Sequence, residues 1–486
     1  MHKFIFEGEY SHYSPLFFRH LQNNITKNFV TLQRHIKFTN YITDSLWKNT
    51  FATLVGMFTT LKWATLITAS LQAQRLRICP KIGFAQSAAL EKKISQNTKN
   101  DSNYKKGNEH HYNANCPFSY LKLIIMKHTP ILTSLLAMAL LSSCAKTDNL
   151  TMLVGTYTYD TSRGIYSFAF DQENGTASTL DSVEVENPSY LAISSDNQYV
   201  YCVTEKGNDS KVNAFSFDAE NGRLTPINSL PADADPCHIR FIPGNRLSVA
   251  NYSGGTLSIY SIAPDGALSE LQDNIAFNTP IGPDTVRQKG HHIHFSILTP
   301  DNKRLLANDL GADCIHVVDI TEKAAVSSHI ATKPAYGPRH SVFTPDGKNL
   351  YLLNELSGHI VAYHYDTNAG FTEFQDIVAD EADAHGSADI TISPDGRFLY
   401  ASHRLKNDGI SIFEIAGDGT LKKVGYCNTQ SHPRNFIITP NGKYMLVACR
   451  DGNVIQVLKR DAETGLLTDT ASNIVVPRPV CIKFAN

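Results

Sequence analysis

The feature that most constrains the fold is a repeat of about 48 residues that runs through the last 300 or so residues of the chain. The clearest copy begins GPRHSVFTPDGKNLYLLNE at Gly337, and it recurs as GSADITISPDGRFLYASHR from Gly386 and HPRNFIITPNGKYMLVACR from His432. Aligned anchor positions fall at residues 188, 236, 291, 338, 387, 433 and 479. Such a period indicates one repeat architecture rather than several unrelated domains.

Each repeat contains four short runs of alternating residues, such as NLYLLNE and HIVAYHY, joined by tight-turn sequences such as TPDG. Four antiparallel strands per unit are typical of a propeller blade. The anchor at Pro479 opens a single strand, and the segment 151–171 supplies the strands that this last unit lacks. We therefore predict an all-β fold over residues 150–486. It is a seven-bladed β-propeller with four antiparallel strands per blade, closed by pairing of the N- and C-terminal strands.

Charge divides the chain at about residue 125. Residues 1–125 carry 16 Lys and Arg against 6 Asp and Glu, whereas residues 126–486 carry 28 against 40. The total of −2 gives no indication of nucleic-acid binding. We interpret residues 1–125 as an upstream extension without function.

A signal sequence follows that extension. Met126-Lys127-His128, an apolar run over 131–141 and the sequence LSSC ending at Cys144 are typical of a bacterial lipoprotein leader. We predict a signal peptide at 126–143, lipidation of Cys144, a short linker at 144–149 and a lipid-anchored location in the bacterial envelope. The alternatives are an ordinary secretory signal, a buried helix between two domains, or a cytoplasmic protein whose leader is not processed.

The repeat alignment also predicts which side chains meet at the centre, where propellers bind ligands. Two columns collect acids, arginines and histidines, which are rarely placed in a constricted interior without partners. One column lies just after the anchor and the other ends the following strand; they include His292, Arg339, Arg434, Tyr252, Glu355 and Arg404. The columns form either a network of salt bridges, such as Glu355 with Arg404, or a pocket for an anionic or polyhydroxylated small molecule.

Two local motifs add to these columns. His292 and His294 are two residues apart and are expected on one face of a strand, an arrangement that can bind a metal. No carboxylate cluster or third histidine follows at ligand spacing, so we predict no metal and no cofactor. Gly337-Pro338-Arg339-His340 places its arginine in the first column.

The chain from about residue 150 resembles the seven-bladed lactonase propeller family, which contains bacterial 6-phosphogluconolactonases and fungal carboxy-muconate cyclase. The matching strings are VGTYT at 154–158, GIYSFAFD at 164–171, NPSYLAIS at 187–194, ANY at 250–252, RQ and HHIH within 287–294, NDLGAD at 308–313, GPRH at 337–340, NEL at 354–356, SHR at 402–404, HPRNF at 432–436 and PVCIKF at 479–484. One departure is His403, where the family pattern usually has Asn before the Arg.

The resemblance implies hydrolysis of a lactone, above all 6-phosphoglucono-1,5-lactone. We predict that the protein is a monomer and needs no cofactor. The resemblance also implies a catalytic set of His292 or His294, Arg339, Arg404 and Glu355. Glu355 or His294 is predicted to activate water and Arg339 to stabilise the oxyanion. The predicted substrate-binding residues are Asn251, Tyr252, Gln288, Asp309, His340, Asn354, His403 and Arg434. No GxSxG motif is present, which argues against an acyl-enzyme. A muconate-type cyclase and a non-catalytic binding module remain alternatives.

Overall fold

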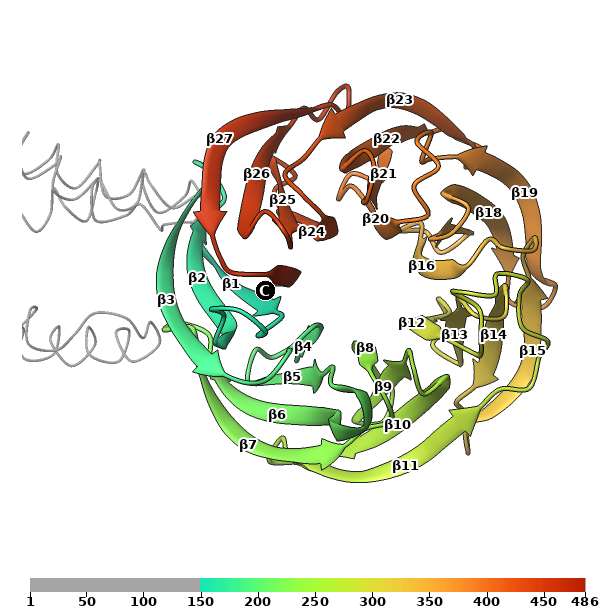
Figure 1. Cartoon of the computed structure of the whole chain (residues 1–486), viewed down its shortest axis with the longest axis horizontal. Coiled ribbons are helices and arrows are strands. Elements are labelled where there is room, and N and C mark those ends of the chain that lie inside the picture. The colour runs from blue at the N-terminus through green and yellow to red at the C-terminus, as the bar shows by residue number, and fades with distance from the viewer. Residues whose placement is uncertain (1–148, 486) are drawn as a thin grey trace, which may run out of the picture. The chain divides into compact units, whose positions relative to one another are not determined.

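The computed structural model describes residues 149–485, in which strands form a ring of radially arranged sheets (Figure 1). Within this range, 28 strands make seven antiparallel sheets of four strands each, which confirms the predicted propeller. The first strand begins at Asn149, one residue before the predicted boundary. The predicted upstream extension, the signal peptide, Cys144 and residues 145–148 of the linker lie outside the described residues.

We number the blades in chain order and write each from its innermost strand outward. Blade 1 consists of β28 (Pro479–Phe484), β1 (Asn149–Thr156), β2 (Gly164–Asp171) and β3 (Thr176–Glu184); blade 2 of β4 (Leu191–Ile193), β5 (Tyr199–Thr204), β6 (Lys211–Asp218) and β7 (Arg223–Pro231); blade 3 of β8 (Pro236–Ile242), β9 (Arg246–Asn251), β10 (Thr256–Ile262) and β11 (Leu268–Ala276); blade 4 of β12 (Ile293–Leu298), β13 (Arg304–Asp309), β14 (Cys314–Asp319) and β15 (Ala325–Ala331). Blade 5 consists of β16 (Pro338–Phe343), β17 (Asn349–Asn354), β18 (His359–Asp366) and β19 (Gly370–Val378); blade 6 of β20 (Ser387–Ile392), β21 (Phe398–His403), β22 (Gly409–Ile415) and β23 (Leu421–Asn428); blade 7 of β24 (Pro433–Ile438), β25 (Tyr444–Cys449), β26 (Val454–Arg460) and β27 (Leu467–Val475).

The turn between the first two strands of a blade is built by the TPDG-type sequence. In blade 5 the Thr344 hydroxyl donates to the Asp346 carboxylate at 2.7 Å, and that carboxylate accepts the backbone N–H of Lys348 at 3.1 Å. Gly347 has a φ of +71°, a left-handed conformation that suits glycine. The same hydroxyl-to-Asp or hydroxyl-to-Asn hydrogen bond recurs at Ser393 and Thr439. The repeated turn motif therefore fixes the hairpin that carries the two innermost strands.

Adjacent blades are held together by apolar side chains and by a repeated tyrosine. Tyr351 and Leu353 of blade 5 pack with Leu399 of blade 6 in one buried cluster. Burying a side chain of this size contributes about 1.5–3 kcal/mol. The Tyr351 hydroxyl also donates to the Gly419 carbonyl of the next blade at 2.6 Å. Side chains alternate between the two faces of each blade, so apolar residues pack against both neighbouring blades. This packing lets the repeats close into a ring.

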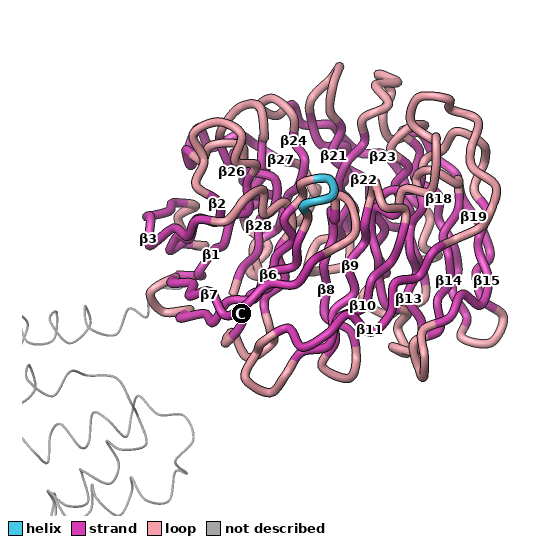
Figure 2. The backbone as a smooth tube through the Cα atoms, turned by 60° about the horizontal axis from the view of Figure 1, so that its bottom comes forward, coloured by secondary structure: helices cyan, strands magenta, loops and turns pink. Residues whose placement is uncertain are grey.

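The ring closes where the C-terminal strand β28 pairs with β1, as predicted. The register joins Met152 to Phe484 and Val154 to Ile482, and the Ala485 N–H donates to the Thr151 carbonyl at 2.8 Å. The tube view shows loops crowded at both ends of the strands and one helical turn, η2 (Gly207–Asp209) (Figure 2). In the described part of the chain, no helix combines the length and apolar character that crossing a membrane requires.

Candidate active site

The innermost strands carry a β-bulge near their start that sets the direction of one side chain. The pairing of β16 with β17 shifts between Pro338 and His340, which leaves Arg339 at the bulge. The corresponding shifts on β8, β12 and β24 leave Cys237, His294 and Arg434 in the same position. A bulge turns a side chain out of the regular alternation of a strand, and bulges are frequent next to active sites.

The strand register corrects one column of the repeat alignment. The alignment placed His292 level with Arg339, but Ile293 pairs with Asp309 as Pro338 pairs with Asn354. His294, rather than His292, is therefore the blade 4 equivalent of Arg339. The error arose because the anchor in blade 4 was set on a histidine two residues before the strand begins.

Glu355 lies at the centre of a group of charged side chains, because three arginines contact its carboxylate. It follows β17 directly, and its side chain is 7% exposed. Its carboxylate lies 2.8 Å from Arg287 Nη2, 2.6 Å from Arg339 Nε and 3.4 Å from Arg404 Nη2. These residues come from blade 5, from the loop before blade 4 and from the position directly after β21 in blade 6. The predicted pair of Glu355 with Arg404 is thus part of a four-residue cluster.

The ionisation of Glu355 is fixed by its neighbours. Burial alone would raise the pKa of its carboxyl group, but the charges of Arg404, Arg339 and Arg287 outweigh burial and lower the pKa to about 2. A carboxylate with so low a pKa is a poor proton acceptor at neutral pH. The geometry therefore disfavours the predicted role of Glu355 as the base and favours a role in holding the arginines.

A second group of charges joins blades 7, 1 and 2. The Tyr157 hydroxyl donates to the Glu205 carboxylate at 2.9 Å, and the Arg434 guanidinium lies over the Tyr157 ring at 5.4 Å. Burial raises the pKa of Tyr157, which keeps its hydroxyl protonated. The positive charge of Arg434 also interacts with Glu355, so the two groups share one electrostatic environment.

His292 is placed beside the arginine cluster by Tyr252. The two rings stack with centroids 4.4 Å apart, and His292 Nδ1 donates to the Tyr252 carbonyl at 2.8 Å. Because a carbonyl can only accept, the neutral ring keeps its lone pair on Nε2. The Tyr252 hydroxyl in turn lies 3.3 Å from Arg287 Nη2.

His294 and His340 lie in a deeper layer of aromatic rings. Their ring centroids are 5.2 Å apart, and Phe295 lies 4.5 Å from the His340 ring. Burial lowers the pKa of His294 well below 6.5, and burial also lowers the pKa of His340 to about 4 although Asp389 binds its Nδ1 at 2.8 Å. His294 Nδ1 and His340 Nε2 are buried without a hydrogen-bond partner. These two nitrogens can still bind a ligand or an ordered water.

Three predicted substrate-binding residues make hydrogen bonds inside their own blades, although the Oδ1 atoms of Asn251 and Asn354 are buried without a partner. Asn251 donates to Thr256 and Ser258, and Asn354 donates to the His359 carbonyl. Both ring nitrogens of His403 lie 2.8 Å from serine hydroxyls, on Ser387 and Ser411. The departure from the family pattern at His403 is therefore accommodated within blade 6.

Gln288 and Asp309 are likewise occupied within the protein. Gln288 Nε2 donates to the Leu310 carbonyl at 2.9 Å and to Asp313 at 2.8 Å. Asp309 accepts hydrogen bonds from backbone N–H groups and contacts two histidines. Of the predicted residues, Tyr252, His292, Arg339, Glu355 and Arg404 are the ones that these contacts gather around one point, and Arg434 joins them through its charge.

Arg287 is the main residue that the predictions missed. It is one third exposed, whereas Arg339 and Arg404 are almost fully buried, so it is the most accessible guanidinium on Glu355. Its signal was its position beside Gln288 and shortly before the HHIH motif, in a loop that the repeat alignment did not cover. Tyr157 was also missed, because it follows β1 in the unit that closes the ring, which the aligned column did not include; its pairing with Glu205 was therefore not predicted.

A family model described as lactonase, seven-bladed beta-propeller, matches residues 151–484. The chain belongs to this family. The 6-phosphogluconolactonase of Formosa agariphila is 37% identical over 341 residues, which cover 67% of this chain and 96% of that protein. The 6-phosphogluconolactonase of Bacillus subtilis is 33% identical over 342 residues, covering 68% and 97%.

Solved structures agree with these relatives. A candidate 6-phosphogluconolactonase from Bacteroides fragilis is 48% identical with a TM-score of 0.69, covering 70% of this chain and 99% of that one. The periplasmic gluconolactonase of Pseudomonas aeruginosa is 27% identical with a TM-score of 0.66, at the same coverage. The comparisons confirm the predicted family, the predicted fold and the predicted class of enzyme, a lactone hydrolase.

Proposed function

We propose that this propeller hydrolyses a phosphorylated sugar lactone, with 6-phosphoglucono-1,5-lactone as the substrate that fits best. The observation that carries the proposal is the charge of the Glu355 cluster. Three guanidinium groups, from Arg287, Arg339 and Arg404, contact a single carboxylate. Two positive charges are therefore uncompensated within these four side chains. A phosphate monoester carries a charge of about −1.5 to −2 near pH 7, which matches that excess.

The exposure of the arginines divides their roles. Arg287 is one third exposed and binds the phosphate of the substrate, because an accessible guanidinium donates several hydrogen bonds. Arg339 and Arg404 lie behind Glu355 and hold it in place. The oxyanion role predicted for Arg339 is not kept in this proposal, because its guanidinium is buried against Glu355.

We assign the general base to His292. Its Nδ1 is committed to the Tyr252 carbonyl, and this contact orients Nε2 as the acceptor for a proton from water. His294 is a weaker candidate, because burial and the charge of Arg339 keep its pKa low. Glu355 is weaker still, because its carboxylate is shared by three arginines.

The test compares freshly prepared 6-phosphogluconolactone with unphosphorylated gluconolactone, after subtraction of spontaneous ring opening. The proposal expects a kcat/KM at least tenfold higher for the phosphorylated lactone. It also expects Arg287→Gln to remove most of that preference. Arg163→Gln, which changes an arginine paired with Glu184 on the protein surface, is the matched control and keeps the preference. Equal rates on both lactones would refute phosphate selection, and no acceleration of either would refute lactone hydrolysis.

The second candidate is an unphosphorylated gluconolactone met in the cell envelope. The similarity to the periplasmic gluconolactonase of Pseudomonas aeruginosa and the lipoprotein-type leader support it. We propose lipid anchoring at Cys144 on the leader sequence alone. Labelling of the wild-type chain, but not of Cys144→Ser, with a radioactive fatty acid in bacterial cells tests the anchor. An unlabelled wild-type chain in the soluble cell fraction would contradict it.

A further inference from the structure

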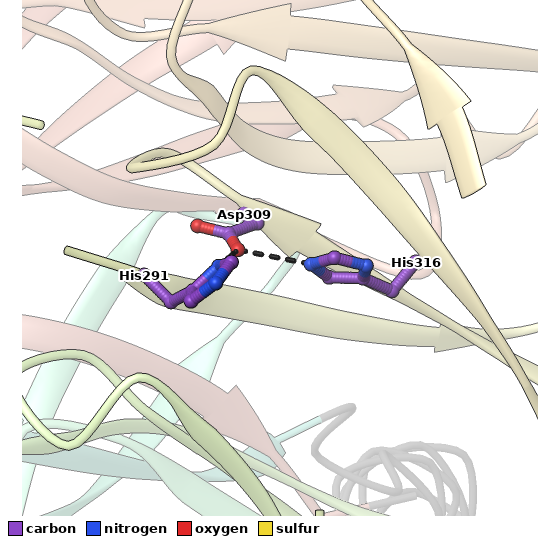
Figure 3. A group of neighbouring side chains, drawn as sticks. All are labelled: His291, Asp309 and His316. Carbon is purple, nitrogen blue, oxygen red and sulfur yellow. Dashed lines mark hydrogen bonds and ion pairs between the residues drawn. The ribbon is translucent and has the colours of Figure 1, made fainter. Parts of the chain in front are cut away.

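A histidine–aspartate–histidine group lies in blade 4, beside the candidate active site. Figure 3 shows the Asp309 carboxylate between the rings of His291 and His316. Asp309 Oδ2 lies 2.6 Å from His291 Nδ1 and 2.9 Å from His316 Nε2. The three atoms all lie within 4.8 Å of one another, from a loop, the end of β13 and the middle of β14.

The orientation of the Asp309 carboxylate is fixed by the backbone. Its Oδ1 accepts the N–H groups of His292, Gly311 and Ala312 at 2.9, 2.9 and 3.1 Å. Oδ2 is therefore directed at the two imidazoles, and the carboxylate is fully buried. Hydrogen bonds that hold a carboxylate in this way are typical of the surroundings of metal ligands.

We propose that His291, Asp309 and His316 bind one divalent transition-metal ion, with Zn²⁺ as the best fit. Two imidazole nitrogens and one carboxylate oxygen are a ligand set that zinc accepts, whereas Mg²⁺ and Ca²⁺ prefer oxygen ligands throughout. The Cys314 thiol, 3.6 Å from His316 Nε2, is a soft neighbour of this group but lies outside it. This neighbour also favours zinc over the harder cations.

Binding needs a small adjustment that this part of the chain allows. Zinc bonds of about 2.0–2.1 Å separate tetrahedral ligands by about 3.3 Å, so the imidazoles must move outward by less than 1 Å. Each imidazole would carry its proton on the ring nitrogen that does not face the metal. The His291 side chain belongs to a loop and is 17% exposed, so it is the less tightly enclosed of the two imidazoles. A cavity of about 240 Å³ lined by Thr279, Ala312 and Cys314, among others, reaches the thiol from the surface.

The ion would act on the candidate active site through Asp309. One oxygen of this carboxylate binds the backbone of His292, which we assign as the base, and the other would bind the metal. The ion is thus a positioning element that stiffens the segment 291–292 and does not contact the lactone. This ligand set could not be recognised from the sequence, because the ligands belong to three segments with irregular spacing.

The test measures metal directly and does not depend on lactonase activity. The purified full chain, stripped with a chelator, is titrated with ZnCl₂, and bound zinc is determined by mass spectrometry after dialysis. The wild-type chain is expected to retain one equivalent and to gain thermal stability. His316→Gln and His291→Asn keep an N–H donor at the position of the present hydrogen bond but lose the imidazole. Both are expected to weaken zinc binding at least tenfold.

His359→Asn is the matched control. His359 Nδ1 contacts Asp376 at 2.6 Å in blade 5. Among the described residues, this pair is not part of a group of three possible metal ligands. This variant is expected to bind zinc as tightly as the wild-type chain. A wild-type chain that retains no zinc would overturn the proposal. So would equal affinity in His291→Asn, which alters a partly exposed loop residue and is expected to fold even if His316→Gln does not.

Discussion

Replacing Glu355 by Gln tests the central claim about the arginine cluster. The substitution keeps the shape of the side chain but removes the negative charge that three guanidinium groups share. The pKa of Glu355 falls from 4.5 to about 2 in the folded protein. At about 1.36 kcal/mol per pKa unit, this shift corresponds to about 3 kcal/mol of stability. This loss agrees with the cost of about 3–5 kcal/mol for removing one partner of a buried ion pair.

The same reasoning predicts the pH dependence of this effect. The pKa is lowered on folding, so the stabilisation is fully present above the unfolded-state pKa of 4.5 and is lost as the pH falls toward 2. The difference in unfolding free energy between the wild-type chain and Glu355→Gln should therefore be constant from pH 7 to pH 5. It should shrink as the pH is lowered further.

Urea unfolding followed by tyrosine fluorescence measures this difference. Glu184→Gln is the matched control, because it removes an exposed carboxylate that pairs with a single arginine, Arg163. The control is expected to lose less than about 1 kcal/mol. A Glu355→Gln variant within about 1 kcal/mol of the wild type, or a difference that does not shrink in acid, would refute the assignment of Glu355 as the shared counter-ion.

Four further predictions follow from the contacts. His292→Ala should lower kcat by about 10²–10⁴ with an intact far-ultraviolet circular dichroism spectrum, as expected for loss of a general base. Arg287→Gln should raise KM for the phosphorylated lactone at least tenfold more than KM for the unphosphorylated one, in initial-rate assays. His403→Ala should cost about 1–3 kcal/mol in urea unfolding, because the buried Ser387 and Ser411 hydroxyls lose their hydrogen bonds to the imidazole, and leave KM unchanged. Gly311→Ala should destabilise the chain by about 3 kcal/mol in the same assay, because the added Cβ would lie 1.8 Å from the Gly290 carbonyl oxygen.

The architecture could be predicted because the same blade pattern of strands and turns occurs several times in the sequence. The TPDG-type turn recurs in the sequence, and in the structure each copy closes the same hairpin through a hydroxyl-to-carboxylate or hydroxyl-to-amide hydrogen bond. Ring closure could be predicted because Pro479 opens a single strand that needs partners, and β28 does pair with β1. The turn and the strand pattern depend on residues close together in the chain, so a single sequence is enough to recognise them.

The candidate site could be predicted only as a set of positions. A column of aligned residues states where each Cα lies, and it correctly brought Arg339, Arg404 and Glu355 to one place. It does not state where a side chain points, so it could not separate these residues from His403, whose ring turns back between two serines of its own blade.

Arg287 shows the complementary reason why part of the site escaped prediction. It has no equivalent in the other repeats, because it lies in the long loop between β11 and β12 that lengthens one step of the period. A repeat alignment discards such insertions as irregularities. In a closed ring, however, a loop inserted at one end of an inner strand has no free space except above the centre or outside the rim. The guanidinium of Arg287 reaches the buried Glu355 carboxylate, so this loop lies over the centre. The residue that breaks the repeat therefore supplies the accessible charge that the symmetric positions, buried beneath it, cannot offer to a substrate.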